Sequence, residues 1–488
     1  MTVPSRPRHA ALAATLSFLF PGLGQAYAGQ RELAVLFSAP VILLVLGGLL
    51  AGSLLGDELR DRLFSSSFLV ALLVLDLALL GWRIFAITHA GVTTPGARRP
   101  GPLLLAAIGV LLILTVAMHA YAGWVISSFN AALGEVFSGG TVPIAGTVGD
   151  DAPPAPVNEP TYEWDGTERI NFLLLGIDAA PGREDSLTDT ILVVSVDPVS
   201  REAVMVSIPR DTGFMPLPDT SLFADGLYPE KINQLATDAQ AAPDVWCPDL
   251  EEPSSCGIRT LERTVGLYLG IDIQYFAQLD LAGFAHLINA MGGVELCIPG
   301  SRLSDPDYED TLTGQRGIAL EGGCELRNGQ EALAYARIRS GVLVADDGTF
   351  VPQDDFKRAA RQQEVLLAIR DELAAADTLF ELPGLLDAIG RTVSTDFPRD
   401  QAGDLASLLP LIAGTDIERV VLGLPAFVEP PVDPEVNYLL IPRRAAVRLE
   451  AQRLFGDDGP LAGWYVGSDA PTPDEAGERV DDEAAPTP

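Results

Sequence analysis

Lysine is nearly absent from this chain of 488 residues, in which Lys231 and Lys357 are the only lysines among 32 basic residues. The preference for arginine runs through the whole chain, so a single arginine says little, and a lysine is the unusual choice. Histidine is also scarce: there are four, and only His286 follows residue 160. This shortage argues against an imidazole-based metal site or a Ser-His-Asp triad in the longer C-terminal part.

Positive charge as a whole is in short supply, with 32 Lys+Arg against 66 Asp+Glu. Residues 1–160 are almost balanced, with 8 basic and 9 acidic residues, while residues 161–488 hold 24 basic and 57 acidic residues. The field of this acidic part would repel a phosphate polyanion such as DNA. We therefore expect no nucleic-acid partner.

The four cysteines all lie in the acidic part, which predicts two disulfides in an oxidising compartment. Four cysteines allow three connectivities, and we favour pairing between sequence neighbours. Unpaired buried thiols are the alternative, since a zinc site would need more ligands than these spacings offer. The pairs we expect are Cys247 with Cys256 and Cys297 with Cys324.

Long apolar runs are abundant near the N-terminus. Residues 33–55, 67–88 and 103–126 are each long and apolar enough to cross a bilayer. A fourth run, 11–29, is interrupted by Pro21-Gly22 and Gln25, so we interpret it as a re-entrant or interfacial segment. Residues 1–127 are thus expected to form a membrane region of about three transmembrane helices.

The arginines flanking these runs predict the topology, because positively charged loops stay in the cytoplasm. With three crossings, the N-terminus and the loop before the last span are inside, and everything after residue 126 is outside. The sequence therefore predicts a multi-pass plasma-membrane protein with an extracytoplasmic C-terminal domain. The arginines concerned are Arg6, Arg8, Arg83, Arg98 and Arg99.

Asp76 stands inside an otherwise apolar span. A carboxylate there can mark a proton or ion path. We favour a contact between helices or subunits, because we identify no partner cation in the neighbouring spans.

The external part opens with residues 128–166, which are rich in glycine, proline and small residues and are expected to form a flexible linker. Residues 167–456 then alternate between β-rich runs and runs with helical spacing, which predicts an α/β domain with covered sheets. Residues 457–488 are acidic and proline-rich and are expected to be disordered. The expected strands are 170–178, 190–197 and 202–210, and the expected helices are 261–270, 281–291 and 355–375.

Two aspartates face one loop of this domain: Asp178 closes the first strand and Asp189 opens the second. Carboxylate oxygens suit a hard cation, and Mg²⁺ often needs only one or two carboxylates plus substrate phosphate. Taken alone, they would be interpreted as ordinary turn and cap aspartates.

Several cations could face an anion. Arg337 and Arg339 would point to the same face if the chain is extended there. Arg358 and Gln362 are four apart on an expected helix and share a face, whereas Arg361 lies one position off and is expected to pair with Glu364 or Asp355. Surface ion pairs are the alternative for all of them. The remaining candidates are Arg210 with Asp211, at the end of the third strand, and Lys231 near a helix start.

Read together, these pieces resemble the LytR-CpsA-Psr family of bacterial cell-wall proteins. The resemblance covers about 200 residues in the family's order and spacing, which is far more specific than any one motif. The matching stretches are FLLLGID (172–178), TDTILVVSVD (188–197), VSIPRDT (206–212), KIN (231–233), GGVEL (292–296), NGQEALAYARIR (328–339) and FKRAARQQ (356–363).

The resemblance implies an α/β domain with a central mixed sheet flanked by helices, and a long apolar pocket for a lipid beside a pyrophosphate site. It implies a phosphotransferase, dependent on Mg²⁺ or Mn²⁺, that moves a glycopolymer from a polyprenyl-pyrophosphate carrier to a muramic acid hydroxyl of peptidoglycan. The glycopolymer would be a teichoic acid, a capsule or an arabinogalactan-like polymer. Peptidoglycan and membrane lipids are the other partners expected.

The same resemblance assigns roles by motif. Asp178 and Asp189 would be the metal ligands and would act in catalysis together with Arg210, Arg337 and Arg339. The contacts to the pyrophosphate would come from Arg210, Lys231, Arg337, Arg339, Arg358 and Gln362. A carboxylate would act as general base.

One position departs from the family pattern, which usually has an arginine two residues before Asp189, where this chain has Leu187. Either Arg183 reaches in from the same loop, or the site works with one cation fewer. Two other functions compete with transfer: non-catalytic binding of an anionic wall polymer in a regulatory protein, and hydrolysis of the polyprenyl pyrophosphate.

Overall fold

The protein is described from a computed structural model, in which placed helices and strands account for most of the chain. By contact, the chain divides into two compact units, residues 1–131 with 399–403 and residues 132–398 with 404–488, and each is described by itself. The described residues are 9–54, 62–94, 101–137, 164, 166–177, 187–248, 250, 253–310, 313–375, 388–390, 392–412, 415–431 and 438–456.

The first unit is built from apolar helices. Three of them are long and apolar enough to cross a membrane, with mean hydropathies of 2.6, 2.2 and 2.5 over their most apolar windows. Their leucine, valine and isoleucine side chains are largely exposed, as expected for helices that face lipid. These helices are α3 (Arg31–Leu54), α5 (Ser66–Thr93) and α6 (Pro102–Val136).

The run at 11–29 forms two short helices, α1 (Ala10–Leu19) and α2 (Leu23–Tyr27), instead of one long helix. Gly22 makes the turn between them with a φ of 99°, and a Cβ there would lie 2.0 Å from the Ser38 hydroxyl. Buried Gln25 accepts a hydrogen bond from Ser17 at 2.9 Å and donates one to the carbonyl of Ala86 at 2.9 Å. The interrupted segment thus packs against α5 through buried polar contacts.

Asp76 of α5 has a partner that the sequence analysis missed. Its Oδ1 lies 2.7 Å from Nδ1 of His119 on α6. The search from the sequence considered only permanent cations, whereas a histidine can bond a carboxylate as a neutral donor. The contact supports the interpretation of Asp76 as a helix–helix residue.

The second unit contains a six-stranded mixed sheet in the order β11-β6-β1-β2-β3-β12. β2 pairs antiparallel with β1 and β3, whereas β1 pairs parallel with β6 and β3 pairs parallel with β12. The strands are β1 (Ile170–Ile177), β2 (Thr188–Val196), β3 (Ala203–Ser207), β6 (Tyr275–Asp280), β11 (Val393–Thr395) and β12 (Glu418–Val421).

Alternating side chains cover both faces of this sheet. Leu173 and Leu175 of β1 pack toward α7 (Ile232–Ala241), α9 (Cys256–Leu269) and α15 (Arg444–Phe455). Phe172 and Leu174 of the same strand pack on the other face, toward α12 (Asp355–Ala375) and α14 (Ala402–Ile412). Both faces are therefore buried, which explains the near-continuous apolar runs in these strands.

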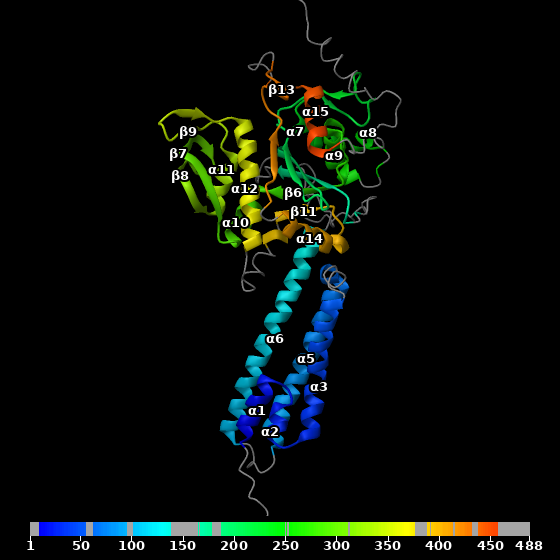
Figure 1. Ribbon diagram of the computed structural model, residues 1–488, viewed down its shortest axis with the longest axis vertical. Helices are drawn as coiled ribbons and strands as arrows, with labels where there is room; N and C mark the ends of the chain where they lie inside the picture. The colour runs from blue at the N-terminus through cyan, green and yellow to red at the C-terminus, as the bar shows by residue number, and fades with distance from the viewer. Residues whose placement is uncertain are drawn as a thin grey trace, which may run out of the picture. The chain divides into compact units, whose positions relative to one another are not determined.

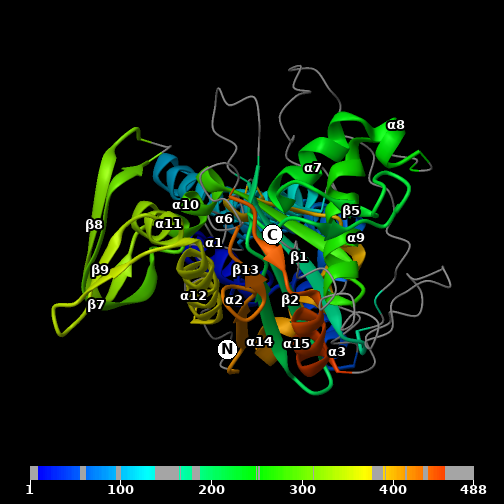
Figure 2. The same ribbon diagram turned by 90° about the horizontal axis from the view of Figure 1, so that it is seen from above.

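A second sheet has four strands in the order β10-β9-β7-β8 and packs against α10 (Leu281–Ala290), α11 (Gly329–Arg337) and α12. Figures 1 and 2 both show α12 between the two sheets, in agreement with its contacts to β7 and to β3 and β12. The strands are β7 (Val294–Glu309), β8 (Arg316–Arg327), β9 (Val342–Val344) and β10 (Phe350–Pro352).

Short elements complete the unit. Two small ladders pair β4 with β5 and β13 with β14. These elements are β4 (Met215–Pro216), β5 (Leu227–Tyr228), α8 (Pro243–Trp246), η1 (Pro253–Ser255), β13 (Val428–Glu429) and β14 (Ile441–Pro442). The short helix η2 (Arg399–Gln401) belongs to the first unit.

Several boundaries differ from the sequence prediction. The expected linker begins too early, because α6 continues as a helix through residues 128–136. Residues 138–163 of that linker and the expected tail 457–488 lie outside the described residues. The third strand ends at Ser207, which leaves Arg210 in the following turn. The extended conformation considered for residues 337–339 is wrong for Arg337, which ends α11 as a helical residue.

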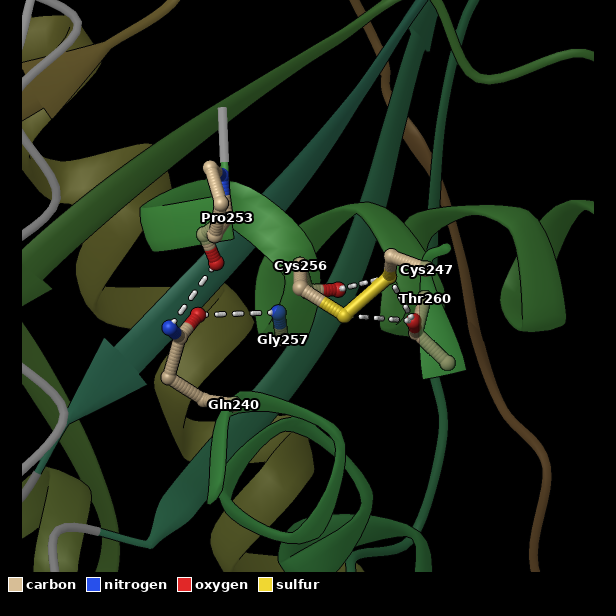
Figure 3. Close-up of a disulfide and its surroundings, with 6 residues drawn as sticks. All are labelled: Gln240, Cys247, Pro253, Cys256, Gly257 and Thr260. Atoms are coloured by element: carbon tan, nitrogen blue, oxygen red, sulfur yellow. Dashed lines mark hydrogen bonds between the residues drawn. A yellow bond between two sulfur atoms is a disulfide. The ribbon is translucent and has the colours of Figure 1, made fainter. Parts of the chain in front are cut away.

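The four cysteines are joined as two disulfides between sequence neighbours, Cys247 with Cys256 and Cys297 with Cys324. The first links α8 to the start of α9, where the Gln240 side chain also bonds the backbone of Pro253 and Gly257 (Figure 3). The second joins residues directly opposite each other in the β7–β8 ladder.

We expect the two disulfides to differ in their contribution to stability. Cys297–Cys324 closes a sequence separation of 27 residues, and Cys247–Cys256 closes one of 9 residues. On the chain-entropy account of disulfides, the double variant Cys297→Ser/Cys324→Ser should lose about 1 kcal/mol more than Cys247→Ser/Cys256→Ser. Urea unfolding followed by tryptophan fluorescence measures both losses. Equal losses, or the reverse order, would contradict the account.

A buried ion cluster ties α9 to the chain that follows β11. Arg259 lies between two carboxylates, 2.8 Å from Glu262 and 2.9 Å from Asp396, and Asp396 also accepts from the Phe276 N–H at 2.8 Å. Burial raises the pKa of Glu262 to about 7, against the opposing effect of Arg259. Burial also raises the pKa of Asp396. The Arg259 guanidinium is thus the ion-pair partner of two buried carboxyl groups.

This cluster predicts a pH dependence of stability. Between the ordinary glutamate pKa of 4.5 and about 7, the folded protein binds a proton at Glu262 that the unfolded chain has lost. The contribution of Glu262 is therefore complete below this window and falls as the pH rises through it. We expect Glu262→Gln to remove a decline on the order of 2 kcal/mol between pH 5 and pH 8.

Urea unfolding at the two pH values measures this decline. Glu429→Gln, at the exposed ion pair with Arg443, is the control. If the free energy of unfolding changes equally in the wild type and in Glu262→Gln between pH 5 and pH 8, the assignment is refuted.

Candidate functional site

Asp189 occupies an irregularity in the ladder between β1 and β2. Gly176 pairs with Thr190 and Ile177 pairs with Thr188, so Asp189 is an extra residue without a partner across the ladder. Such a bulge redirects a side chain and is frequent next to active sites. A Cβ on Gly176 would lie 2.8 Å from the Thr190 side chain, so the bulge depends on a glycine opposite it.

Arg210 follows the neighbouring strand β3 and points to Asp189. Its Nη1 donates to Asp189 Oδ1 at 2.6 Å, and its other nitrogens lie 3.9 Å from Asp355 and 3.9 Å from Asp211. Burial alone would lower the pKa of Arg210, but the carboxylates of Asp189, Asp355 and Asp211 outweigh it and raise that pKa above its ordinary value. The arginine is fully charged and held by acids from three segments.

Arg358 approaches from α12. Its Nη2 donates to the backbone carbonyl of Asp189 at 3.2 Å, and its Nη1 lies 3.1 Å from Asp355 Oδ1, one helical turn earlier. The residue is only 7% exposed. Burial lowers the pKa of Arg358, with Asp355 acting against it and Arg210 acting in the same direction. Two guanidinium groups are thus buried side by side.

These residues line one pocket. Its wall combines the bulge in β2, the end of β3 and the first two turns of α12. Two hydrogen-bond donors at this pocket, the Nε atoms of Arg210 and Arg358, are buried and have no hydrogen-bond partner among the described residues. The lining residues are Asp189, Thr190, Ile191, Ser207, Ile208, Pro209, Arg210, Asp355, Arg358, Ala359 and Gln362.

Lys231 adds a further cation next to Arg210. It is the N-cap residue of α7, and its Nζ lies 2.7 Å from Oδ1 of Asp211, which is itself 5% exposed. The ring of Tyr438 lies 5.9 Å from the Lys231 ammonium. Burial raises the pKa of Tyr438, with added effects from Asp211 and other nearby acids. The unusual lysine is therefore partly buried at the site, not a free surface residue.

The structure thus brings Asp189, Arg210, Arg358 and Gln362 together at the pocket and Lys231 next to it. Arg339 is exposed, and its charge is close enough to act on Arg358. Arg337 is not a lining residue: it lies over the ring of Tyr308, 5.8 Å from the ring centre.

Two predicted residues, Asp178 and Arg183, lie outside the described residues. Whether Arg183 compensates for Leu187 is therefore not tested by the structure. Their roles stay predictions, as do the roles of the residues that the structure brings together.

Three residues near the pocket were missed or misread. Asp355 is three residues before Arg358 on one helical face, so its spacing predicted this ion pair, although we assigned Asp355 to Arg361. Asp211 was seen only as a neighbour of Arg210. Tyr438 could not be found from its local sequence, because about 200 residues separate it from Lys231.

The expected pairing of Arg361 with Glu364 or Asp355 on a solvent face is wrong. Arg361 is only 6% exposed, and its guanidinium donates to backbone and amide oxygens. Burial lowers the pKa of Arg361.

The oxygen atoms around the pocket that could act as metal ligands suit a hard cation. They are the carboxylate oxygens of Asp189 and Asp355, each of which is also paired with an arginine: Asp189 Oδ1 with Arg210 at 2.6 Å and Asp355 Oδ1 with Arg358 at 3.1 Å. The described residues contain no group of three or more His, Cys, Asp and Glu that could hold a metal ion. A Mg²⁺ ion at this pocket would therefore take at most one or two carboxylates from the described residues and its remaining ligands from substrate and water.

Comparison with known proteins gives the family. Residues 144–424, more than half of the chain, match the model of the LytR_cpsA_psr family. The chain belongs to this family. The matched range contains the bulge at Asp189 and the arginines of the pocket, and it ends before Tyr438.

Individual relatives are distant. The chain is 25% identical over 351 residues to the polyisoprenyl-teichoic acid–peptidoglycan teichoic acid transferase TagU of Halalkalibacterium halodurans, covering 71% of this chain and 96% of that protein. It is 29% identical over 232 residues to the regulatory protein MsrR of Staphylococcus aureus, covering 47% of this chain and 57% of MsrR.

Solved structures also resemble this chain, but with low TM-scores. The crystal structure of Bacillus subtilis TagV is 24% identical with a TM-score of 0.43, covering 59% of this chain and 97% of that one. A structure of TagT bound to LIIa-WTA is 22% identical with a TM-score of 0.43, covering 61% of this chain and 94% of that one. The family assignment rests on the family model.

We expect this pocket to bind the diphosphate that the family resemblance implies. Charge-assisted hydrogen bonds contribute more than neutral ones, so Arg210→Gln and Arg358→Gln should each weaken the binding of inorganic pyrophosphate by roughly tenfold to a hundredfold. Isothermal titration calorimetry on the full chain in detergent, with and without Mg²⁺, measures this. Arg453→Gln is the control, since Arg453 belongs to an exposed ion pair with Glu418 and Glu450. Unchanged affinity in both pocket variants would refute the assignment.

Proposed function

We propose that this protein transfers a glycopolymer from a polyprenyl-pyrophosphate carrier to a muramic acid hydroxyl of peptidoglycan. Family membership and the name of the related TagU support transfer of a wall polymer. The observation that carries the proposal is the pair of largely buried guanidinium groups, Arg210 and Arg358, which line one pocket and whose Nε atoms make no hydrogen bond among the described residues. Planar guanidinium groups suit the paired oxygens of a phosphate.

The reaction that we propose breaks the bond between the bridging oxygen of the pyrophosphate and the phosphorus that carries the polymer. The muramic acid oxygen forms a new bond to that phosphorus, and polyprenyl phosphate leaves. Charge develops on the phosphate oxygens, so catalysis depends mainly on positioning and electrostatic stabilisation. Arg210 and Arg358 would bind these oxygens from two sides of the pocket, and Lys231 would extend the positive surface toward Tyr438.

Acids have two tasks in this scheme. Asp189 and Asp355 keep the two buried arginines charged and oriented, and a pocket carboxylate would accept the proton of the attacking hydroxyl. Asp189, together with Asp178, would hold a Mg²⁺ ion, which would supply further neutralisation of phosphate charge.

We place this reaction outside the cytoplasmic membrane. The three apolar helices support membrane anchoring, and the arginines around them predict that the second unit is extracytoplasmic. Two disulfides in that unit agree with an oxidising compartment. A lipid-linked donor would then be presented at the surface where the protein is anchored.

Transfer can be tested directly with the full chain in nanodiscs, a polyprenyl-pyrophosphate glycan, peptidoglycan and Mg²⁺. We expect Asp189→Ala, Arg339→Ala and Arg358→Gln to lower the rate of polymer attachment by roughly a hundredfold or more, as is typical when a charge-stabilising group is lost. Arg453→Gln should stay within about twofold of wild type, because surface ion pairs contribute little.

The other outcomes separate the competing functions. Equal transfer by all variants would reject the proposed residue roles. Release of the polymer to water without a peptidoglycan acceptor would identify a pyrophosphatase. Polymer binding without any turnover, with Asp189→Ala harmless, would identify a regulatory binding protein, the class that the name of the relative MsrR indicates.

A further inference from the structure

Arg361 neighbours the pocket residue Gln362 but does not line the pocket. Its guanidinium turns toward the end of α11. Nε donates to the Tyr335 carbonyl at 2.8 Å, Nη2 donates to the Ile338 carbonyl, and Nη1 donates to the Gln353 side-chain oxygen at 2.5 Å. Burying an arginine is costly unless its donors are bonded, and here all three nitrogens have acceptors.

Two of these acceptors, the carbonyls of Tyr335 and Ile338, lie at the C-terminal end of α11. The last carbonyls of any α-helix lack a partner within the helix, and α11 ends at Arg337 with only the Ile338 N–H returning to Ala334. Arg361 takes the Tyr335 carbonyl, and the adjacent Gln362 donates to the Ala336 carbonyl at 3.4 Å. A cation at a helix C-terminus is also favoured by the helix dipole. One turn of α12 therefore caps α11.

The cap controls the peptide that carries Arg339. The Ile338 carbonyl bonded by Arg361 belongs to the same planar peptide unit as the Arg339 nitrogen and Cα, so the bond fixes the backbone position from which the Arg339 side chain starts. The Gln353 backbone N–H donates to the Gly341 carbonyl at 2.8 Å, which closes the hairpin that follows. Arg361 thus holds both ends of residues 338–353.

We propose that Arg361 is a positioning residue for the phosphate site: it caps α11 and thereby aims Arg339 at the anion bound between Arg210 and Arg358. This inference rests on the proposed function for the nature of that anion. Arg361 itself does not contact the substrate. A lysine cannot replace it, because one ammonium cannot bond three acceptors fixed in the plane of a guanidinium.

The variants Arg361→Lys and Arg361→Met test this proposal in the full chain. The matched control is Arg370→Met: Arg370 lies on the same helix α12, with a side chain that is 14% exposed, and it also donates to backbone carbonyls, those of Ile412 and Thr415 at 3.2 and 3.0 Å. A misplacement of about 1 Å can cost a hundredfold in rate. We expect kcat/KM for transfer to fall by about tenfold to a hundredfold in both Arg361 variants and by less than about threefold in Arg370→Met.

A double-variant comparison separates positioning from general stability. If Arg361 acts through Arg339, Arg361→Lys should have little further effect on kcat/KM in an Arg339→Gln background, because the two changes remove the same interaction. A purely structural Arg361 would give multiplicative losses in the double variant, which would overturn the proposal. Wild-type kcat/KM in Arg361→Lys would overturn it as well.

Two readouts do not depend on transfer, and so distinguish failure of this inference from failure of the proposed function. Hydrogen exchange of the amides at 337–341 should accelerate at least tenfold in Arg361→Met but not in Arg370→Met. Affinity for inorganic pyrophosphate should fall in Arg361→Lys and not fall further in the double variant with Arg339→Gln. Wild-type exchange and affinity in the Arg361 variants reject the positioning role even if the protein transfers no polymer.

Discussion

The burial of two guanidinium groups beside each other is the constraint on which the architecture of the site depends. Arg210 and Arg358 repel one another in a region with little water, so each needs an acid within reach. Asp189 and Asp355 supply these acids from different segments, and the nearest contacts are 2.6 and 3.1 Å. The bulge in β2, the turn after β3 and the start of α12 must therefore meet at one point, and any change that separates them leaves a buried charge unpaired.

Helix α12 is what brings these segments together. Val365 and Ile369 pack into the cluster of the second sheet, whereas Leu366 and Leu367 pack against the central sheet. Buried Gln363 adds polar bonds to Ser207 of β3 at 2.9 Å and to the Val420 carbonyl of β12 at 3.0 Å. A helix wedged in this way has little freedom to rotate or slide. Arg358 and Gln362 lie on its first two turns and are therefore held in place with it.

The sequence predicted three strands of the central sheet, because β1, β2 and β3 are buried on both faces and read as continuous apolar runs, but it did not predict β6, β11 and β12. It did not predict the sheet of β7 and β8: these strands carry glycines, prolines and charged residues on an exposed face, so their alternation is weak. Helix α11 was misjudged near Arg337, since its C-terminal carbonyls are capped by α12 and not by a local signal such as glycine.

The same distinction applies to the site. Motif order identified Arg210, Arg358 and Lys231, because residue type and spacing are local properties. It could not tell that Arg361 is turned away from Arg358 while Gln362 faces the pocket, since that depends on the angle at which α12 meets α11. His119 was overlooked as the partner of Asp76 for a similar reason: a helix pair brings them to 2.7 Å although 43 positions separate them in sequence.

The acidity of the chain shapes how the pocket can work. Residues 161–488 carry 57 acidic and 24 basic residues, so the long-range field opposes an approaching phosphate. That field is screened within about 10 Å at ordinary ionic strength, whereas contacts within the pocket are shielded from salt by burial. In the function that we propose, binding would depend on close, directional bonds to Arg210, Arg358 and Lys231, which a diphosphate would satisfy. In the same proposal, a membrane anchor would complement this arrangement, because a lipid-linked donor would be concentrated at the membrane and would need no electrostatic steering.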